Sequence, residues 1–232
     1  VSVLGRVENK RILEVGAGSG RDSARLANLG AEVFVLDYAA TPLRLVKRLA
    51  LEKGLSVSLL QADATLSPFR EGVFDCLFHQ GLLEHFRDSR ALLEENRRLL
   101  RDGGVLLVDV PQKYHPYTLL KHALMFFDRW FAGWETEFTV CELENLLREE
   151  GFEIIHTYGN WMSPPLGYRM LRELSVRGPL PALPLYPRSL VALERVFSPL
   201  TESARKKRLF IYLCTVVGAT GRKRGRVRVS TC

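Results

Sequence analysis

The 232-residue sequence lacks long apolar runs, and no stretch approaches the roughly 20 consecutive apolar residues that a membrane-spanning helix needs. Only ten residues precede the first strand-like apolar run, which is too few for a signal peptide. The four cysteines are scattered, with no Cys-x-x-Cys pair and no metal-ligand spacing. These absences argue against a transmembrane, secreted or disulfide-stabilised protein, and we expect a cytoplasmic protein without a metal site.

Acidic residues are missing from the C-terminal end of the chain. From Ser203 onward there are nine Lys and Arg and no Asp or Glu, more than the whole formal net charge of +7. Such a segment can bind nucleic acid or an anionic membrane surface, but it is more often a solvated end, and few aromatic residues are present here to stack on bases. We therefore expect residues 218–232 to be a disordered basic tail, with nucleic acid and membrane as the less favoured partners.

A strand, a glycine turn and a helix near the N-terminus form the most informative stretch. Residues 12–15 are mostly apolar and lead into the run GAGSG at residues 16–20, which helix-favouring residues follow up to Leu29. Glycines let the backbone approach a ligand closely, and free N–H groups lie at a helix N-terminus. A second apolar strand ends at Asp37, whose carboxylate can accept both ribose hydroxyl protons. This βαβ unit is suited to a nucleotide.

The spacing of the glycines separates two classes of nucleotide ligand. A dinucleotide fingerprint has the form G-x-G-x-x-G, whereas Gly16, Gly18 and Gly20 form G-x-G-x-G. Arg21 occupies the place of the third dinucleotide glycine. The spacing therefore disfavours a nicotinamide cofactor, although an NAD(P)-dependent oxidoreductase on a similar frame stays open as an alternative.

With Glu14 in front, the run EVGAGSG resembles the first motif of class I S-adenosylmethionine-dependent methyltransferases, especially small-molecule and quinone-biosynthesis members. The resemblance continues in order through the stretch LSPF at residues 66–69, the strand at 73–78 and a helix-Gly-Gly-strand passage around Gly103. It implies S-adenosyl-L-methionine as cofactor. It also implies a Rossmann-like, doubly wound α/β sheet of seven strands, mostly parallel, with an antiparallel C-terminal hairpin strand and cap insertions.

The resemblance assigns the cofactor-binding residues. The acid that ends the second strand binds the ribose, and the acid after the third strand binds the adenine together with the next backbone N–H. The residues that the resemblance implies are Glu14, Gly16, Ala17, Gly18, Gly20, Asp37, Tyr38, Asp63, Ala64 and Gln80. For Asp63 a second interpretation stays open, in which it is a loop acid that caps the turn before Pro68.

His79 and His85 are the two imidazoles near the expected reaction centre, where the fourth strand ends. An unperturbed imidazole titrates near neutral pH and can remove a proton from a methyl acceptor. Both are therefore candidate catalytic residues, while a packing or hydrogen-bonding role stays open for each. Methyl transfer from a sulfonium depends mostly on alignment in a dry pocket, so it does not require a conspicuous base.

The length of the chain suits one catalytic domain, which we expect to span residues 1–217. Residues 111–137 are dense in aromatic rings and residues 160–204 contain repeated prolines, and both follow strands that end at the ligand edge. We expect these two insertions to form a cap or an acceptor pocket. A capping box begins a helix at Thr139, and residues 209–217 are expected to form the seventh strand.

The acceptor class is narrowed by two missing motifs. The fourth strand does not end in the [DN]-P-P-[YF] signature of amino-nitrogen methyltransferases, and there is no Pro-Cys nucleophile motif for pyrimidine methylation. The aromatic and apolar insertions favour a small hydrophobic acceptor such as a quinone, a lipid or a natural-product ring. An RNA- or ribosome-directed methyltransferase that uses the basic tail stays open as the alternative.

Overall fold

The structure is a computed structural model of the chain. It describes residues 4–116, 135–160 and 214–225, together with positions 118, 122, 125, 168, 171, 172, 175, 176, 181, 183, 184, 187, 211 and 212. Most of the two expected insertions, and residues 226–232 of the expected tail, lie outside the described residues.

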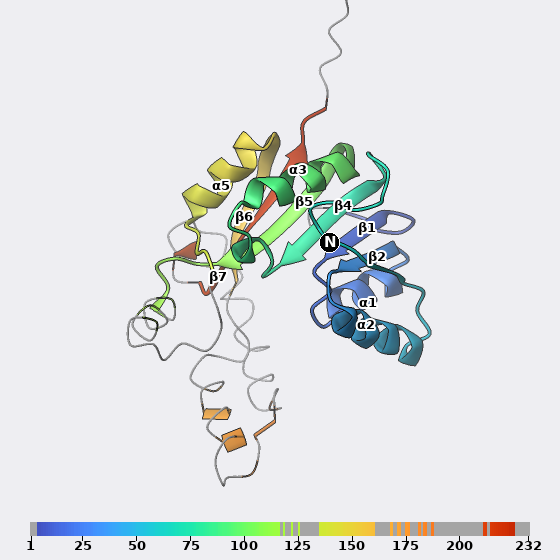
Figure 1. Cartoon of the computed structure of the whole chain (residues 1–232), viewed down its shortest axis with the longest axis horizontal. Helices are drawn as coiled ribbons and strands as arrows, with labels where there is room; N and C mark the ends of the chain where they lie inside the picture. Colours follow the sequence, from blue (N-terminus) through green and yellow to red (C-terminus); the bar gives the residue numbers. More distant parts are fainter. Residues whose placement is uncertain are drawn as a thin grey trace, which may run out of the picture.

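A seven-stranded sheet in the order β3-β2-β1-β4-β5-β7-β6 forms the centre of the described part (Figure 1). Its strands are β1 (Arg11–Val15), β2 (Glu32–Asp37), β3 (Ser58–Gln61), β4 (Phe74–Gln80), β5 (Leu100–Pro111), β6 (Phe152–Asn160) and β7 (Val216–Lys223). The pairs from β3 to β5 are parallel, and β7 is antiparallel to both β5 and β6. The expected doubly wound sheet with an antiparallel C-terminal strand is confirmed.

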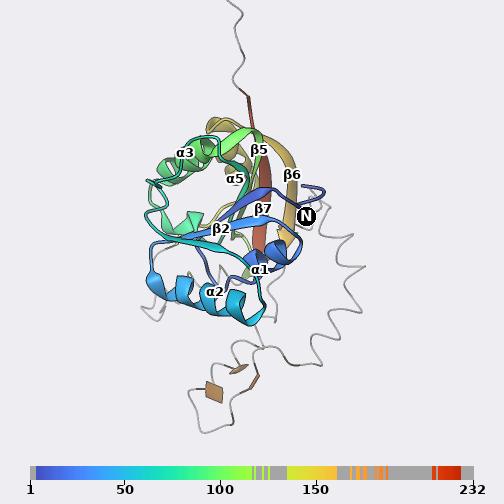
Figure 2. The ribbon, with the colours of Figure 1, turned by 90° about the vertical axis from the view of Figure 1, so that its right-hand side faces the viewer.

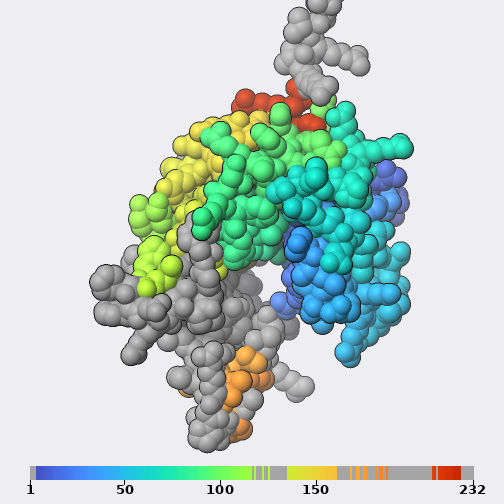
Figure 3. Space-filling view, in the orientation of Figure 1, coloured from blue at the N-terminus to red at the C-terminus, as the bar shows by residue number. Residues whose placement is uncertain are grey.

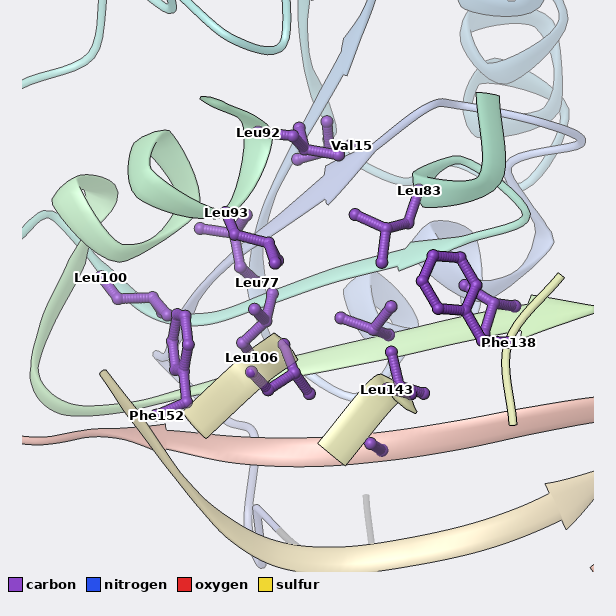
Figure 4. Packing of buried hydrophobic residues seen from close by; sticks show 14 of the residues in the cluster. Val15, Leu77, Leu83, Leu92, Leu93, Leu100, Leu106, Phe138, Leu143 and Phe152 are labelled. Atoms are coloured by element: carbon purple, nitrogen blue, oxygen red, sulfur yellow. The ribbon is translucent and has the colours of Figure 1, made fainter. Parts of the chain in front are cut away.

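Helices cover both faces of this sheet, as Figures 1 and 2 show from two sides. The described helices are α1 (Arg21–Asn28), α2 (Ala40–Glu52), the 3-10 helix η1 (Leu83–His85), α3 (Ser89–Leu99) and α5 (Val140–Glu149). Residues of α3 and α5 pack into one hydrophobic core and residues of α2 into a second core on the other face. In the first core, Leu93, Leu106 and Leu143 lie between the sheet and its helices (Figure 4).

Local signals begin and end these helices. Thr139 Oγ1 accepts from the Glu142 N–H at 3.1 Å, and the Glu142 carboxylate accepts from the Thr139 N–H at 2.8 Å, so the expected capping box is present at α5. Gly151, with φ 84°, follows the end of this helix. Backbone with positive φ is readily adopted only by glycine, which fixes where the chain turns back into β6.

The seventh strand differs from the expected one. β7 covers Val216–Lys223, so only the last two residues of the expected strand at 209–217 belong to it. Residues 218–223, which we expected to begin a disordered tail, form the strand between β5 and β6. The reason is packing, because a Cβ on Gly221 would lie 2.8 Å from Cβ of Phe152. The glycines that this close packing needs make the strand look like a loop in the sequence.

Candidate functional site

The glycine turn leaves β1 and enters α1 in a conformation that only glycine adopts readily. Gly16, Gly18 and Gly20 have φ of 81°, 46° and 66°. A Cβ on Gly20 would lie 2.6 Å from Val46 on α2, so this glycine is required by packing. A Cβ on Gly18 would have no atom within 4 Å, so the space beside it is open. The turn therefore fits a ligand that approaches the backbone at Gly18.

Asp37 connects the end of β2 to this glycine turn. Its Oδ2 accepts from the Ala17 N–H at 2.8 Å and its Oδ1 from the Ala39 N–H at 2.7 Å. A carboxylate has about four lone-pair sites, so these two hydrogen bonds leave room for two hydroxyl donors. The half-buried side chain can thus hold the glycine turn and bind a ribose at the same time.

Glu14 lies beneath the turn. It is buried and accepts a hydrogen bond from the Ser23 hydroxyl on α1. Burial raises the pKa of Glu14 to about 7, against the opposing effect of the Ser23 hydrogen bond. The acid of the first motif therefore supports the first turn of α1 from below.

The ends of β2 and β3 lie side by side, which brings the next candidates near Asp37. Gln61 Nε2 donates to the carbonyl oxygen of Tyr38 at 3.1 Å, and the Ala62 N–H donates to the Asp37 carbonyl oxygen at 3.1 Å. Both Tyr38 and Asp63 are exposed. They can be reached by a ligand that extends from Asp37 along this edge.

Asp63 also has a local structural role. Its Oδ1 accepts from the backbone N–H and the hydroxyl of Thr65, both at 2.8 Å, and the backbone hydrogen bond is the main cause that lowers its pKa. This is the turn-capping interaction that the sequence left open. Both of these bonds are made by Oδ1, so Oδ2 can still accept from a ligand. The adenine contact implied for Asp63 and Ala64 stays a prediction.

The two candidate histidines occupy different environments. His79 has no exposed surface, and burial lowers its pKa to about 3, so the imidazole is neutral. An acceptor cannot touch a side chain in that position, and the geometry favours the packing role for His79. His85 lies on η1 and is exposed, so its candidacy as a base stays a prediction.

Gln80 is hydrogen-bonded to the buried Asp109, which is in turn hydrogen-bonded to the half-buried Tyr158, and the sequence pattern identified neither of these two residues. Asp109 on β5 accepts from Tyr158 Oη at 2.6 Å and from Gln80 Nε2 at 3.2 Å. Burial raises the pKa of Asp109 to about 6, and burial together with Asp109 raises the pKa of Tyr158. The position of Asp109, close to the end of a parallel strand, was a signal that could have identified it.

The surface is indented where the blue N-terminal βαβ unit meets the green residues of the chain (Figure 3). A separate hollow of about 300 Å³ lies at the opposite edge of the sheet, lined by Glu71, Gly72, Arg101, Asp102 and Lys223. That hollow contains none of the candidate residues. None of the described helices has the length and apolar composition needed to cross a bilayer. Within the described ranges, no cluster of three His, Cys, Asp or Glu could hold a metal ion.

Known proteins match this arrangement in sequence and in fold. Residues 13–108 match the family described as "Methyltransferase domain". The ubiquinone biosynthesis O-methyltransferase of Nitrosococcus oceani is 27% identical over 174 residues, which are 72% of this chain and 74% of that protein. The demethylmenaquinone methyltransferase of Thermus thermophilus is 38% identical over 101 residues, 43% of this chain and 46% of that protein.

A solved structure extends the similarity to nearly the whole chain. The S-adenosylmethionine-dependent methyltransferase of Mesorhizobium loti has a TM-score of 0.61 at 16% identity, and the match covers 96% of this chain and 94% of that one. At this identity the likeness shows the fold. Together with the domain matched over residues 13–108 and the ordered motifs, it confirms the resemblance of this chain to class I S-adenosylmethionine-dependent methyltransferases in sequence and in fold.

Proposed function

We propose that this protein transfers a methyl group from S-adenosyl-L-methionine to a small hydrophobic organic acceptor of the quinone, lipid or natural-product class. The observation that carries the proposal is that the Asp37 carboxylate accepts from the Ala17 N–H in the glycine turn between β1 and α1, directly beside the open Gly18. When bound, the cofactor supplies an electrophilic methyl group on a sulfonium.

The residues at the edge of the sheet would bind and orient this cofactor. Asp37 would accept hydrogen bonds from the ribose hydroxyls, and Tyr38 would lie beside them. Asp63 would accept from the adenine amino group, and the Ala64 N–H would donate to an adenine ring nitrogen. The backbone at Gly16, Ala17, Gly18 and Gly20 would follow the ligand closely, while Glu14 would hold α1 in place. Correct alignment contributes up to roughly 7 to 11 kcal/mol to such a transfer, so the catalytic requirement is mainly positional.

The acceptor class is supported by the relatives and by the sequence of the insertions. Two of the similar proteins are named for ubiquinone and demethylmenaquinone methylation. Residues 111–137 and 160–204 contain the aromatic and apolar side chains that would cover such a ring. His85 would remove the proton of an acceptor hydroxyl if the acceptor needs a base.

Lys223, one of the basic C-terminal residues that the structure describes, has structural partners. Lys223 Nζ donates to the Leu100 carbonyl oxygen at 2.6 Å and lies 3.7 Å from Asp102 Oδ1. This pairing lies at the edge of the sheet opposite the glycine turn. It gives no support to an RNA-directed role.

Calorimetric titration with S-adenosylmethionine tests the first half of the proposal, and we expect saturable binding of one molecule per chain. Mass spectrometry tests the second half. The protein is incubated with S-adenosylmethionine and a demethylated quinol, and we expect the quinol to gain one methyl group. A folded protein that does not bind the cofactor would contradict the proposal. A protein that binds the cofactor but methylates only RNA would contradict the acceptor class.

A further inference from the structure

We infer that Asp109 and Tyr158 are positioning residues that hold the Gln80 amide with its carbonyl oxygen turned toward the methionine ammonium of the bound cofactor. The inference rests on the proposed function for the identity of the ligand. The arrangement of the three side chains is independent of that function and can be tested without a ligand.

The register of the sheet puts the three residues in one row. Gln80 on β4 pairs with Asp109 on β5, Asp109 pairs with Gly218 on β7, and Gly218 pairs with Tyr158 on β6. Paired residues on adjacent strands project to the same face, so all three side chains lie on one side of four consecutive strands.

Gly218 has no side chain, which allows Tyr158 on β6 to reach Asp109 on β5 across β7. A Cβ at this position would lie 2.3 Å from Asp109 Oδ1 and 2.3 Å from Tyr158 Cζ. The Tyr158 ring therefore passes over β7 where a side chain is missing, and its hydroxyl reaches Asp109 at 2.6 Å. This close packing is the physical reason for a glycine in the middle of β7.

The hydrogen bonds fix the direction of the Gln80 amide. An ionised carboxylate can only accept, so Asp109 requires a donor from each neighbour. Tyr158 supplies an O–H to Oδ1 and Gln80 supplies its Nε2–H to Oδ2 at 3.2 Å. The amide nitrogen of Gln80 is then turned inward, and its carbonyl oxygen is turned away from Asp109. Gln80 itself is exposed, so that oxygen can accept from a ligand.

The strand order indicates which part of the cofactor reaches Gln80. β1 lies between β2, which ends at Asp37, and β4, which ends at Gln80. A nucleoside with its ribose at Asp37 therefore extends its methionine part over the glycine turn toward β4. Leu82, two residues beyond Gln80, would lie 3.5 Å from a Cβ on Gly16, so the two turns are neighbours. A cation suits this place, because Asp22 on α1 adds negative charge near Asp109.

Protonation of Asp109 would release the amide. Burial raises the pKa of Asp109 to about 6, while the hydrogen bonds from Tyr158 and Gln80 act in the opposite direction. Below that pH one carboxyl oxygen carries a proton and can itself donate, so Asp109 no longer requires a donor from Gln80 and the direction of the amide is no longer fixed. Two further titratable groups lie near this row, Asp22 and His156, whose imidazole stacks on the Tyr158 ring with centroids 5.7 Å apart. No charge comes from β7, where the row contains Gly218.

The first test uses NMR on the ligand-free protein. The side-chain carboxyl carbon of Asp109 and the side-chain amide of Gln80 are followed from pH 4.5 to 8. We expect one shared midpoint near pH 6, and we expect Tyr158→Phe to move it upward, because the variant loses a hydrogen bond that favours the carboxylate. His156→Gln is the matched control and should leave the midpoint in place. A Gln80 amide that does not follow the Asp109 titration overturns the inference.

The second test measures binding by calorimetry at pH 7.5. We expect Asp109→Asn to weaken S-adenosylmethionine binding about tenfold, and to have no further effect in a Gln80→Ala background. We also expect it to leave the binding of 5′-methylthioadenosine unchanged, because that nucleoside lacks the ammonium. An equal loss in the Gln80→Ala background, or for 5′-methylthioadenosine, would show a merely structural role and overturn the inference. A wild-type protein that binds no S-adenosylmethionine refutes the proposed function, and the NMR titration still decides the arrangement of the side chains.

Discussion

Asp37 and Asp109 lie near the ends of two parallel strands in the same sheet, yet the chain holds them in opposite ways. Asp37 is half-buried and accepts from two backbone N–H groups close to it in the edge loops. Asp109 is buried and accepts from the side chains of Gln80 and Tyr158, which are 29 and 49 residues away in the sequence. The first arrangement leaves a carboxylate open to a ligand, whereas the second places a carboxylate behind another residue.

The donors around each carboxylate decide whether an aspartate at the end of a strand binds a ligand directly or positions another residue. Backbone donors occupy part of the Asp37 carboxylate without covering it, so it can still accept hydroxyl protons. Side-chain donors enclose Asp109, and the missing side chain at Gly218 makes room for the Tyr158 ring beside it. Burial raises the pKa of Asp109 to about 6. The same residue type at similar positions therefore performs direct binding on β2 and positioning on β5.

Filling the space beside the glycine turn should have the largest effect on cofactor binding. Gly18→Val places a side chain in the space beside the turn, where no atom lies within 4 Å of the new Cβ, and we expect cofactor affinity to fall more than about 100-fold. Gly103→Val is the matched control, because Gly103 also has a positive φ of 74° and open space around it. Calorimetry on both variants separates the effects. If Gly103→Val loses affinity equally, backbone strain rather than ligand contact is responsible.

The sequence predicted the Asp37 site at the glycine turn far better than the environment of Asp109. The glycine spacing and Asp37 could be identified because the Asp37 carboxylate is hydrogen-bonded to Ala17 and Ala39, which lie in or next to one βαβ unit. The hydrogen-bond partners of Asp109 could not be predicted, because they depend on the register of β4, β5, β7 and β6. The bounds of β7 were wrong for the same reason, since its glycines are explained by Asp109, Tyr158 and Phe152 on the two neighbouring strands.

The acid beneath the turn should make stability depend on pH. The folded-state pKa of Glu14, raised by burial to about 7, exceeds its ordinary value of 4.5, so its contribution is complete below pH 4.5 and is lost as the pH rises through 7. We expect Glu14→Gln to remove up to about 3 kcal/mol of this dependence, at about 1.4 kcal/mol per pKa unit. Urea unfolding from pH 4 to 8 measures it.

Glu95 provides the opposite sign as a control. Although burial alone would raise its pKa, hydrogen bonds from Arg98 and Ser67 outweigh that effect and lower it. Its contribution is present above the ordinary pKa of 4.5 and is lost as the pH falls through the lowered folded-state value. Glu95→Gln should therefore destabilise the protein at neutral pH and have less effect in acid. A Glu14→Gln variant with the same pH profile as Glu95→Gln would contradict the burial of Glu14.

A side chain at Gly218 in β7 tests the close packing around Asp109. In Gly218→Ala the new Cβ would lie 2.3 Å from Asp109 Oδ1, so Asp109 and Tyr158 must move apart. We expect the free energy of unfolding to fall by about 2 kcal/mol, within the range for overpacked sites. Gly225→Ala is the control, because its Cβ would meet Asp102 only at an ordinary 3.9 Å. Urea unfolding compares the two, and equal stabilities would contradict the close packing of Asp109 and Tyr158 across β7.

Removing the open carboxylate should affect binding more than folding. Asp37→Ala loses the acceptor for the ribose hydroxyls, and we expect cofactor binding to weaken by about 1 to 3 kcal/mol. The Ala17 N–H loses its partner too, so thermal unfolding is measured alongside calorimetry. Unchanged affinity would show that the ribose is bound elsewhere and would remove the distinction between the two carboxylates.

The third strand end lies between these two cases and should show the smallest change. Asp63 is exposed like a binding group, but its Oδ1 already accepts from both donors of Thr65. We expect Asp63→Ala to weaken cofactor binding about threefold, less than Asp37→Ala, because an exposed hydrogen bond competes with water. Thr65→Val is the matched control for the loss of the hydroxyl contact to Asp63. If Thr65→Val reproduces the whole effect, Asp63 acts by shaping the turn, as Asp109 acts by holding Gln80, and β2 alone ends in a direct ligand.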